Sequence, residues 1–293
     1  MKRLWINRKP ITKLTNKIVG SIYAILGFIS LFVSFDGMLS SLSNIWEKIL
    51  VSTIILSAVW LFCYIVSGVI LINKKRFEII SANNGYKLYI QYGNIFDEKV
   101  IINSLERRNI VIPVNRCFDT IVDNDLISEK TLHGDFFKKL YAQNIYTENS
   151  LNIKIQQKLA NMNYKTISKN DKTRGNRKRY DVGTIINLPI SNKENYLLWG
   201  LSSFDNQLKA HTTMQEYVLA VQKLIEACNT ESEGFPVVIP LVGAGLSRTN
   251  KGQEDIISYL INAFKLNKSE INCDIHIVIK EELKNEISII DIK

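Results

Sequence analysis

Cysteine is scarce in this sequence and forms no recognisable pattern. The 293 residues contain four, and none belongs to a C-x-x-C pair: Cys63, Cys117, Cys228 and Cys273. A zinc site or a disulfide framework would show paired cysteines, so neither is expected, and a reducing compartment is the default. We therefore expect no metal ion and no cofactor.

Acidic residues are almost absent from the first quarter of the chain. Residues 1–76 contain ten Lys or Arg and two Asp or Glu, a net charge of +8, whereas residues 77–293 contain 27 and 26, a net charge of +1. The basic character thus belongs to the N-terminal segment. This distribution argues against a nucleic-acid partner and indicates charge beside membrane lipid.

Two long runs, residues 18–35 and 49–72, contain no charged residue. A bilayer core of about 30 Å needs about 20 helical residues, so each run is long enough to span it. Neither run has a polar face, which argues against buried helices of a soluble core. The first run is also too long for a cleaved signal peptide. We expect a two-helix transmembrane hairpin over residues 18–76, behind a basic cytoplasmic N-terminus, residues 1–17.

Flanking charge predicts the orientation of the hairpin. Lysine and arginine are dense before the first span and after the second, and sparse between the two. Positive charge stays inside, so both termini are expected to be cytoplasmic at the plasma (inner) membrane. The spans contain no ionisable group apart from the Cys63 thiol, whereas an ion or proton pathway needs such groups. The hairpin therefore indicates an anchor or a self-assembling segment, not a transporter.

From Phe77 onward the pattern alternates between strands and helices, which indicates an α/β domain over residues 77–293 with a parallel or mixed sheet flanked by helices. Thr213-x-x-Glu216 is a capping box in front of a helix. Expected strands are 86–92, 109–115, 184–188, 195–200, 237–240 and 275–279, and expected helices are 152–164, 214–228 and one beginning near 254.

The strand at 237–240 ends at Pro240 and is followed by a glycine-bearing loop. Ligands of such sheets bind at the carboxyl ends of the strands, where Asn115 and Gly200 also lie. Glycine N–H groups can approach phosphate oxygens closely, and the start of a following helix assists them. The alternative is a tight turn without a ligand. Gly243, Ala244, Gly245, Leu246, Ser247 and Arg248 are the loop residues concerned.

On these residues the chain resembles the macro-domain family, which binds ADP-ribose. Gly93-Asn94-Ile95 stands where the family has a Gly-Asp-Ile turn, and 110–115 matches the strand that leads into its first ligand loop. The strand 196–200, the helix 214–228 and the segment 237–248 follow in the family's order. The resemblance covers roughly residues 80–285. It implies a macro-like sheet whose glycine loop holds a diphosphate.

The resemblance assigns further candidate contacts. It implies that Asn115 holds a ribose hydroxyl, that Arg116 and Arg248 meet phosphate, and that His133 and Gly134 replace a glycine-rich loop. The alternatives are a strand-end cap for Asn115, an exposed surface charge for Arg116 and Arg248, and a structural role for His133.

Two departures from the family bear on adenine recognition and on catalysis. Asn94 replaces the acidic residue that receives the adenine amino group, a role left open for Asp97. The first loop lacks the second asparagine and the glycines of the hydrolases, which favours binding over cleavage. If the chain is an enzyme, an ADP-ribosyl hydrolase, its catalytic candidates are Asp119 and His133.

With two spans in front, the layout resembles the membrane-anchored macro effector of Thoeris anti-phage defence. That resemblance implies a sensor of an ADP-ribose-type messenger made by a TIR-domain partner, which forms a homo-oligomer and disrupts the membrane. The alternatives are a membrane-tethered hydrolase and a protein-binding anchor. The basic run 165–179 could touch phosphate or lipid, but a solvated loop or hairpin tip is the favoured interpretation.

Overall fold

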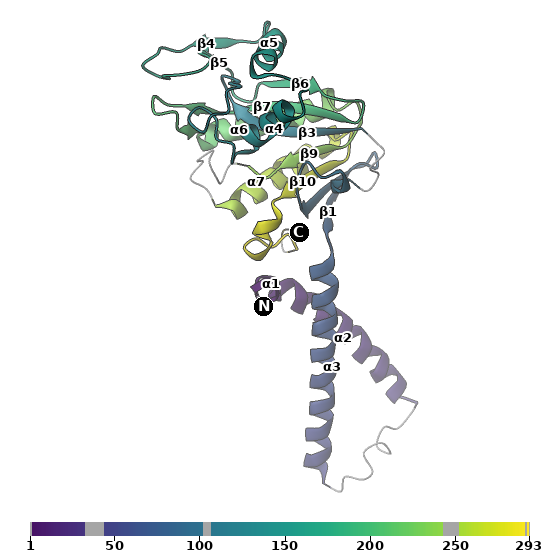
Figure 1. Ribbon diagram of the computed structural model, residues 1–293. Coiled ribbons are helices and arrows are strands. Elements are labelled where there is room, and N and C mark those ends of the chain that lie inside the picture. The colour runs from purple at the N-terminus through teal and green to yellow at the C-terminus, as the bar shows by residue number, and fades with distance from the viewer. Residues whose placement is uncertain (1, 33–43, 102–106, 243–251, 291, 293) are drawn as a thin grey trace. The chain divides into compact units, whose positions relative to one another are not determined.

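The computed structural model describes residues 2–32, 44–101, 107–242, 252–290 and 292. The chain forms two compact units, one of residues 1–77 with 282–293 and one of residues 78–281. Figure 1 labels the helices and strands of each unit.

The first unit consists of helices α1 (Lys2–Ile6), α2 (Arg8–Ser30) and α3 (Ile45–Asn73) and the C-terminal residues. Helices α2 and α3 are joined by a hydrogen bond from Tyr23 Oη to the Leu56 carbonyl, 2.8 Å. The C-terminal segment belongs to the same unit, where Ser288 Oγ donates to Asn7 Oδ1 at 2.6 Å.

Among the described residues, one helix, α3, is long and apolar enough to cross a membrane. The first predicted span falls partly on α2, which begins in the basic segment at Arg8 and ends at Ser30. Residues 33–35 of that span lie outside the described part of the chain. The structure thus supports the span predicted at 49–72 by length and composition, and the span predicted at 18–35 stays a prediction.

The second unit is built on a mixed sheet with the order β1-β2-β10-β9-β3-β7-β6, and β8 pairs with β7. β10 is parallel to β2 and to β9, and β3 is parallel to β9 and to β7, whereas β6 and β8 are antiparallel to β7. The strands are β1 (Arg76–Ser81), β2 (Lys87–Tyr92), β3 (Arg108–Asn115), β6 (Ile185–Pro189), β7 (Glu194–Phe204), β8 (Ala210–His211), β9 (Val237–Pro240) and β10 (Ile275–Ile279).

Helices cover both faces of this sheet, which is why β9 and β10 are buried at every position. One face packs Tyr196 and Leu198 of β7 against Phe136. On the other, Trp199 Nε1 donates to the Ala220 carbonyl at 3.1 Å. The helices are α4 (Leu132–Ala142), α5 (Glu148–Lys158), α6 (Met214–Thr230) and α7 (Gln253–Leu266), with 3-10 turns at Glu98–Val100, Lys268–Glu270 and Glu281–Asn285.

The predicted α/β class, mixed sheet and Thr213/Glu216 capping box are confirmed. The helix predicted at 152–164 is wrong at both ends. A capping box of Thr147 and Ser150 starts α5 earlier, and Tyr164 already belongs to strand β4 (Tyr164–Thr166).

Gly200 was expected at a strand end, but β7 continues to Phe204. A side chain at Gly200 would lie 3.2 Å from the Phe118 ring, so close packing explains this glycine.

Candidate functional site

The carboxyl ends of five parallel strands meet at one edge of the sheet. β3 ends there at Asn115 and β9 at Pro240, and the register pairs Ile110 of β3 with Val238 of β9. The ends of these two neighbouring strands therefore point to the same edge of the sheet. This edge is where ligands of open α/β sheets bind.

The predicted phosphate loop, Gly243, Ala244, Gly245, Leu246, Ser247 and Arg248, lies outside the described residues. Both of its flanks are described. Tyr217 Oη donates to the Val242 carbonyl at 2.9 Å, and the Leu241 N–H bonds the Val278 carbonyl at 2.9 Å. Gly252 then caps α7 without a side-chain bond. The loop thus joins a fixed strand end to a helix N-terminus, where unpaired N–H groups favour an anion.

Asn115 is 2% exposed at the end of β3. Its Oδ1 accepts from the Cys117 N–H at 3.0 Å and from the Asp119 N–H at 3.5 Å, which shapes the turn. Its Nδ2 is buried and makes no hydrogen bond of standard geometry among the described residues, although the Asn115 side chain also acts to lower the pKa of the Asp119 carboxyl. A buried donor without a partner costs about 1–3 kcal/mol, which a ligand oxygen would recover.

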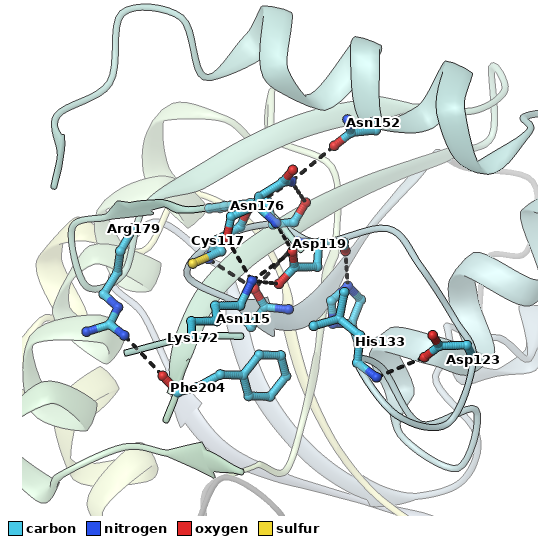
Figure 2. Close-up of polar contacts among 12 residues, drawn as sticks. Asn115, Cys117, Asp119, Asp123, His133, Asn152, Lys172, Asn176, Arg179 and Phe204 are labelled. Carbon is cyan, nitrogen blue, oxygen red and sulfur yellow. Dashed lines mark hydrogen bonds and ion pairs between the residues drawn. The ribbon is translucent and has the colours of Figure 1, made fainter. Parts of the chain in front are cut away.

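The loop after β3, residues 116–120, is held by a second loop from far along the chain (Figure 2). Strands β4 and β5 (Lys178–Tyr180) form an antiparallel hairpin, and residues 167–177 connect them. From this β4–β5 loop, Lys172 Nζ reaches Asp119 Oδ2 at 2.7 Å and Oδ1 at 3.0 Å. Lys172 also donates to the Asn176 carbonyl at 2.7 Å. The lysine side chain is 0% exposed.

Asn176 completes the connection between the two loops. Its N–H donates to Asp119 Oδ1 at 2.6 Å, and its Nδ2 donates to the Cys117 and Phe118 carbonyls at 3.2 Å each. Phe118 has φ of 50°, a left-handed conformation that is strained for a bulky residue. Gly175 packs directly against the Asp119 carboxylate: a Cβ added at this glycine would lie 2.2 Å from Asp119 Oδ1. The β4–β5 loop therefore fixes the conformation that follows Asn115.

Burial dominates the electrostatics of this cluster. Burial raises the pKa of the Asp119 carboxyl, and the Lys172 ammonium and the Asn176 N–H oppose that rise. Burial likewise raises the pKa of the Cys117 thiol to about 11, so this cysteine is a neutral packing group. Both Asp119 oxygens already accept hydrogen bonds, which leaves the carboxylate poorly placed as a general base.

His133 lies in the first turn of α4 and is 6% exposed. Its Nε2 donates to the Asp119 carbonyl at 3.1 Å, and its ring meets Phe137 edge to face at 4.6 Å. Burial lowers the pKa of His133 to about 3, so the imidazole is neutral at pH 7. Gly134 packs against backbone, because an added Cβ would be 2.2 Å from the Ser128 carbonyl oxygen. His133 therefore supports the loop after β3 and Gly134 packs on Ser128 and Glu129, and the ligand contacts predicted for both residues stay predictions.

Arg116 is engaged within the protein. Its Nε donates to the Tyr180 carbonyl at 2.9 Å, and its guanidinium pairs with Glu216 at 2.9 Å. Glu216 also accepts from the Thr213 N–H, so the pair ties the loop to the start of α6.

At the end of β2, Asn94 is exposed and its Oδ1 accepts from the Phe96 N–H at 3.0 Å. Asp97 caps the next turn through the Lys99 N–H at 2.9 Å. The structure therefore places Asn94 at the same carboxyl edge as Asn115, on a strand farther out in the sheet. The ligand contact predicted for Asn94, and the adenine contact left open for Asp97, stay predictions.

Sequence reasoning missed Lys172 and Asn176. The run 165–179 does form the expected hairpin, and most of its basic side chains are exposed. Lys172 is the exception, and nothing local marks it. A separate pocket of ≈ 380 Å³ opens beside the hairpin and contains no predicted site residue; its lining is Asn170, Asp171, Arg179, Ser203, Phe204, Asp205, Asn206 and His211.

The strand order, the flanking helices and the loops at the carboxyl edge define a macro-type α/β domain. Residues 88–280 match the family described as Thoeris protein ThsA, Macro domain, and the chain belongs to this family.

One curated relative is the Thoeris protein ThsA of Bacillus amyloliquefaciens (strain Y2), 28% identical over 191 residues. The match covers 63% of this chain and 59% of that protein, so the chain spans less than two thirds of the relative's length.

The solved structures that the chain matches include macrodomains of Oceanobacillus iheyensis. One mutant shows a TM-score of 0.46 at 11% identity, covering 72% of this chain and 93% of that one. The same macrodomain with ADP shows a TM-score of 0.39 at 9% identity, covering 72% and 90%.

Proposed function

We propose that this protein is a membrane-anchored Thoeris defence effector that binds an ADP-ribose-derived messenger at the carboxyl edge of its sheet. Family membership supports the ligand class. The main observation in favour of this site is the Asn115 Nδ2, a buried hydrogen-bond donor to which a ligand oxygen could supply the acceptor. The loop after β9 contributes N–H groups for the diphosphate.

The cluster around Asp119 supports binding over cleavage. General-base catalysis needs a basic group within reach of the proton it removes. The Asp119 oxygens face Lys172 and the Asn176 N–H, and His133 is buried with one nitrogen bonded to a carbonyl. Hydrolysis of an ADP-ribosylated substrate is the second candidate.

The effector step is also part of the proposal. We infer a two-pass anchor with both termini in the cytoplasm, a messenger supplied by a TIR-domain enzyme, and ligand-driven homo-oligomerisation that disrupts the membrane. Helix α3 supports the anchor. A ligand drives assembly only through differential affinity for the assembled state.

Calorimetry of the full chain in detergent with ADP-ribose tests the binding step. We expect Gly243→Glu to weaken binding by at least about tenfold, because it adds a negative charge where the diphosphate would lie. Ser269→Glu is the matched control, since this exposed residue follows the opposite end of α7. Equal affinities in both variants would remove the glycine loop from the site. Turnover of an ADP-ribosylated peptide that depends on Asp119 would favour the hydrolase instead.

A further inference from the structure

The first unit contains a cleft of ≈ 650 Å³ between α2 and α3. One wall is basic and polar and comes from α2, and the other is aromatic and comes from α3. The lining residues are Arg8, Lys9, Thr12, Lys13, Asn16, Trp60 and Tyr64. None of them takes part in the nucleotide site described above.

The aromatic wall is fixed in place. Trp60 and Tyr64 stack with ring centroids 5.3 Å apart and an angle of 19° between the rings. Trp60 Nε1 donates to Asn16 Oδ1 at 2.9 Å, which joins the two walls at one end. Both rings are partly exposed, and each combines an apolar body with a polar tip, the Nε1 of Trp60 and the hydroxyl of Tyr64.

The basic wall has no acidic partner among the described residues. Lys9 and Lys13 are exposed and one helical turn apart, and like charges at this spacing repel each other. Arg8 stacks over the Trp5 ring at 4.1 Å and bonds the Trp5 carbonyl, so its charge is also uncompensated by an anion. An anion in the cleft would face three cations at once.

The surroundings identify the kind of anion. From the cleft toward its N-terminus, helix α3 continues as an apolar surface on which Leu50 is 62%, Ile54 59% and Ile55 52% exposed. An occupant that satisfies both regions has a negatively charged head and apolar chains. An anionic phospholipid has this chemistry, and a basic pocket between membrane helices is a recognised setting for its headgroup.

We propose that the cleft binds the phosphate headgroup of an anionic phospholipid, with Lys9 and Lys13 on the phosphate and Trp60 and Tyr64 against the glycerol region. This inference rests on the membrane anchoring proposed above and is independent of nucleotide binding. Headgroup binding joins the basic end of α2 to α3 and gives the anchor a preference for anionic membranes.

Native mass spectrometry of the full chain in a non-ionic detergent tests this proposal. The probes are dioctanoyl phosphatidylglycerol, dioctanoyl phosphatidylcholine and inorganic phosphate. We expect phosphatidylglycerol to bind best, and Lys9→Gln/Lys13→Gln to weaken it by about 30-fold, because two charged contacts are lost. Lys74→Gln/Lys75→Gln removes the same charge outside the cleft lining and should change the affinity less than about twofold.

Trp60→Phe supplies a second readout that keeps every charge. It removes the bond to Asn16 and should weaken phosphatidylglycerol binding by about threefold. Circular dichroism and gel filtration confirm that each variant is folded. Three results would overturn the proposal: equal losses in both lysine pairs, equal binding of phosphatidylcholine, or displacement of the lipid by inorganic phosphate at equal concentration. ADP-ribose is absent throughout, so failure of nucleotide sensing does not affect the outcome.

Discussion

Lys172 Nζ lies 2.7 Å from Asp119 Oδ2, and both side chains are within 1% of complete burial. The two residues are 53 positions apart, so this contact clamps the β4–β5 loop onto the loop after β3. The conformation of residues 116–120, next to Asn115, therefore depends on the β4–β5 loop, which is not one of the loops that follow the parallel strands.

Lys172→Met should lower the free energy of unfolding by about 3–5 kcal/mol, because it leaves the Asp119 carboxylate buried without its cation. Chemical unfolding of the full chain in detergent, followed by circular dichroism, measures the change. Lys169→Met is the control, since Lys169 is exposed in the same loop and should change the stability by less than about 0.5 kcal/mol. The double variant Asp119→Asn/Lys172→Met removes both charges and should be more stable than Lys172→Met alone. A double variant as unstable as the single one would contradict a buried ion pair.

Gly175→Ala should destabilise the protein more than Gly234→Ala. The two glycines have φ of +78° and +79°, so both variants carry a similar conformational cost of about 1–2 kcal/mol. Only Gly175 has a close neighbour, Asp119 Oδ1 at 2.2 Å from an added Cβ, whereas Gly234 has none within 4 Å. Overpacking should add about 1–3 kcal/mol at Gly175. Equal thermal unfolding midpoints for the two variants would contradict the tight contact.

His133 should make the protein acid-sensitive. Its pKa falls from 6.5 to about 3 on folding because of burial, so the unfolded chain binds the extra proton between these values. Its contribution to stability is complete above pH 6.5 and is lost as the pH falls toward 3, at up to about 1.4 kcal/mol per pH unit. Urea unfolding between pH 7 and pH 4 measures this slope. His133→Gln should reduce the slope of stability against pH by the contribution of one proton. His211→Gln, at an exposed imidazole, should leave most of that slope in place.

Tyr217→Phe should weaken the binding of ADP-ribose, in addition to any loss of folding stability. The variant loses the bond to the Val242 carbonyl, worth about 1 kcal/mol, at the point where the chain leaves β9 for the predicted phosphate loop. Tyr259→Phe is the control, because the Tyr259 ring lies 5.9 Å from Tyr217 and, within the described part of the chain, its hydroxyl makes no hydrogen bond to β9. Calorimetry with ADP-ribose should show weaker binding for the first variant only. An unchanged affinity would mean that the strand end needs no anchor.

Much of the fold could be predicted because its signals are local. Alternation of apolar residues marked the strand that became β2, short apolar runs marked those that became β3, β9 and β10, and Thr213 with Glu216 marked the start of α6. The predicted helix at 152–164 failed because its true cap, Thr147 with Ser150, lies before the apolar residues that suggested it. A glycine expected at a strand end, Gly200, instead makes room for Phe118.

The site divides in the same way. The sequence alone determined that Asn115 and the glycine loop follow strands, and parallel pairing in the sheet then brings strand ends to one edge. It also determined the basic charge of the first 76 residues. Only the tertiary structure decided that Arg116 pairs with Glu216, and that His133 is a buried neutral support.

The tertiary structure also decided that one lysine of a polar, basic loop would be buried. A charged side chain is rarely buried unless an opposite charge pairs with it, and Asp119 is that partner for Lys172. Such a pairing joins residues 53 positions apart and leaves no periodic trace in either segment. Local patterns therefore specify the strands, the caps and the loop at the sheet edge, whereas the shape of the site depends on contacts that exist only in the folded chain.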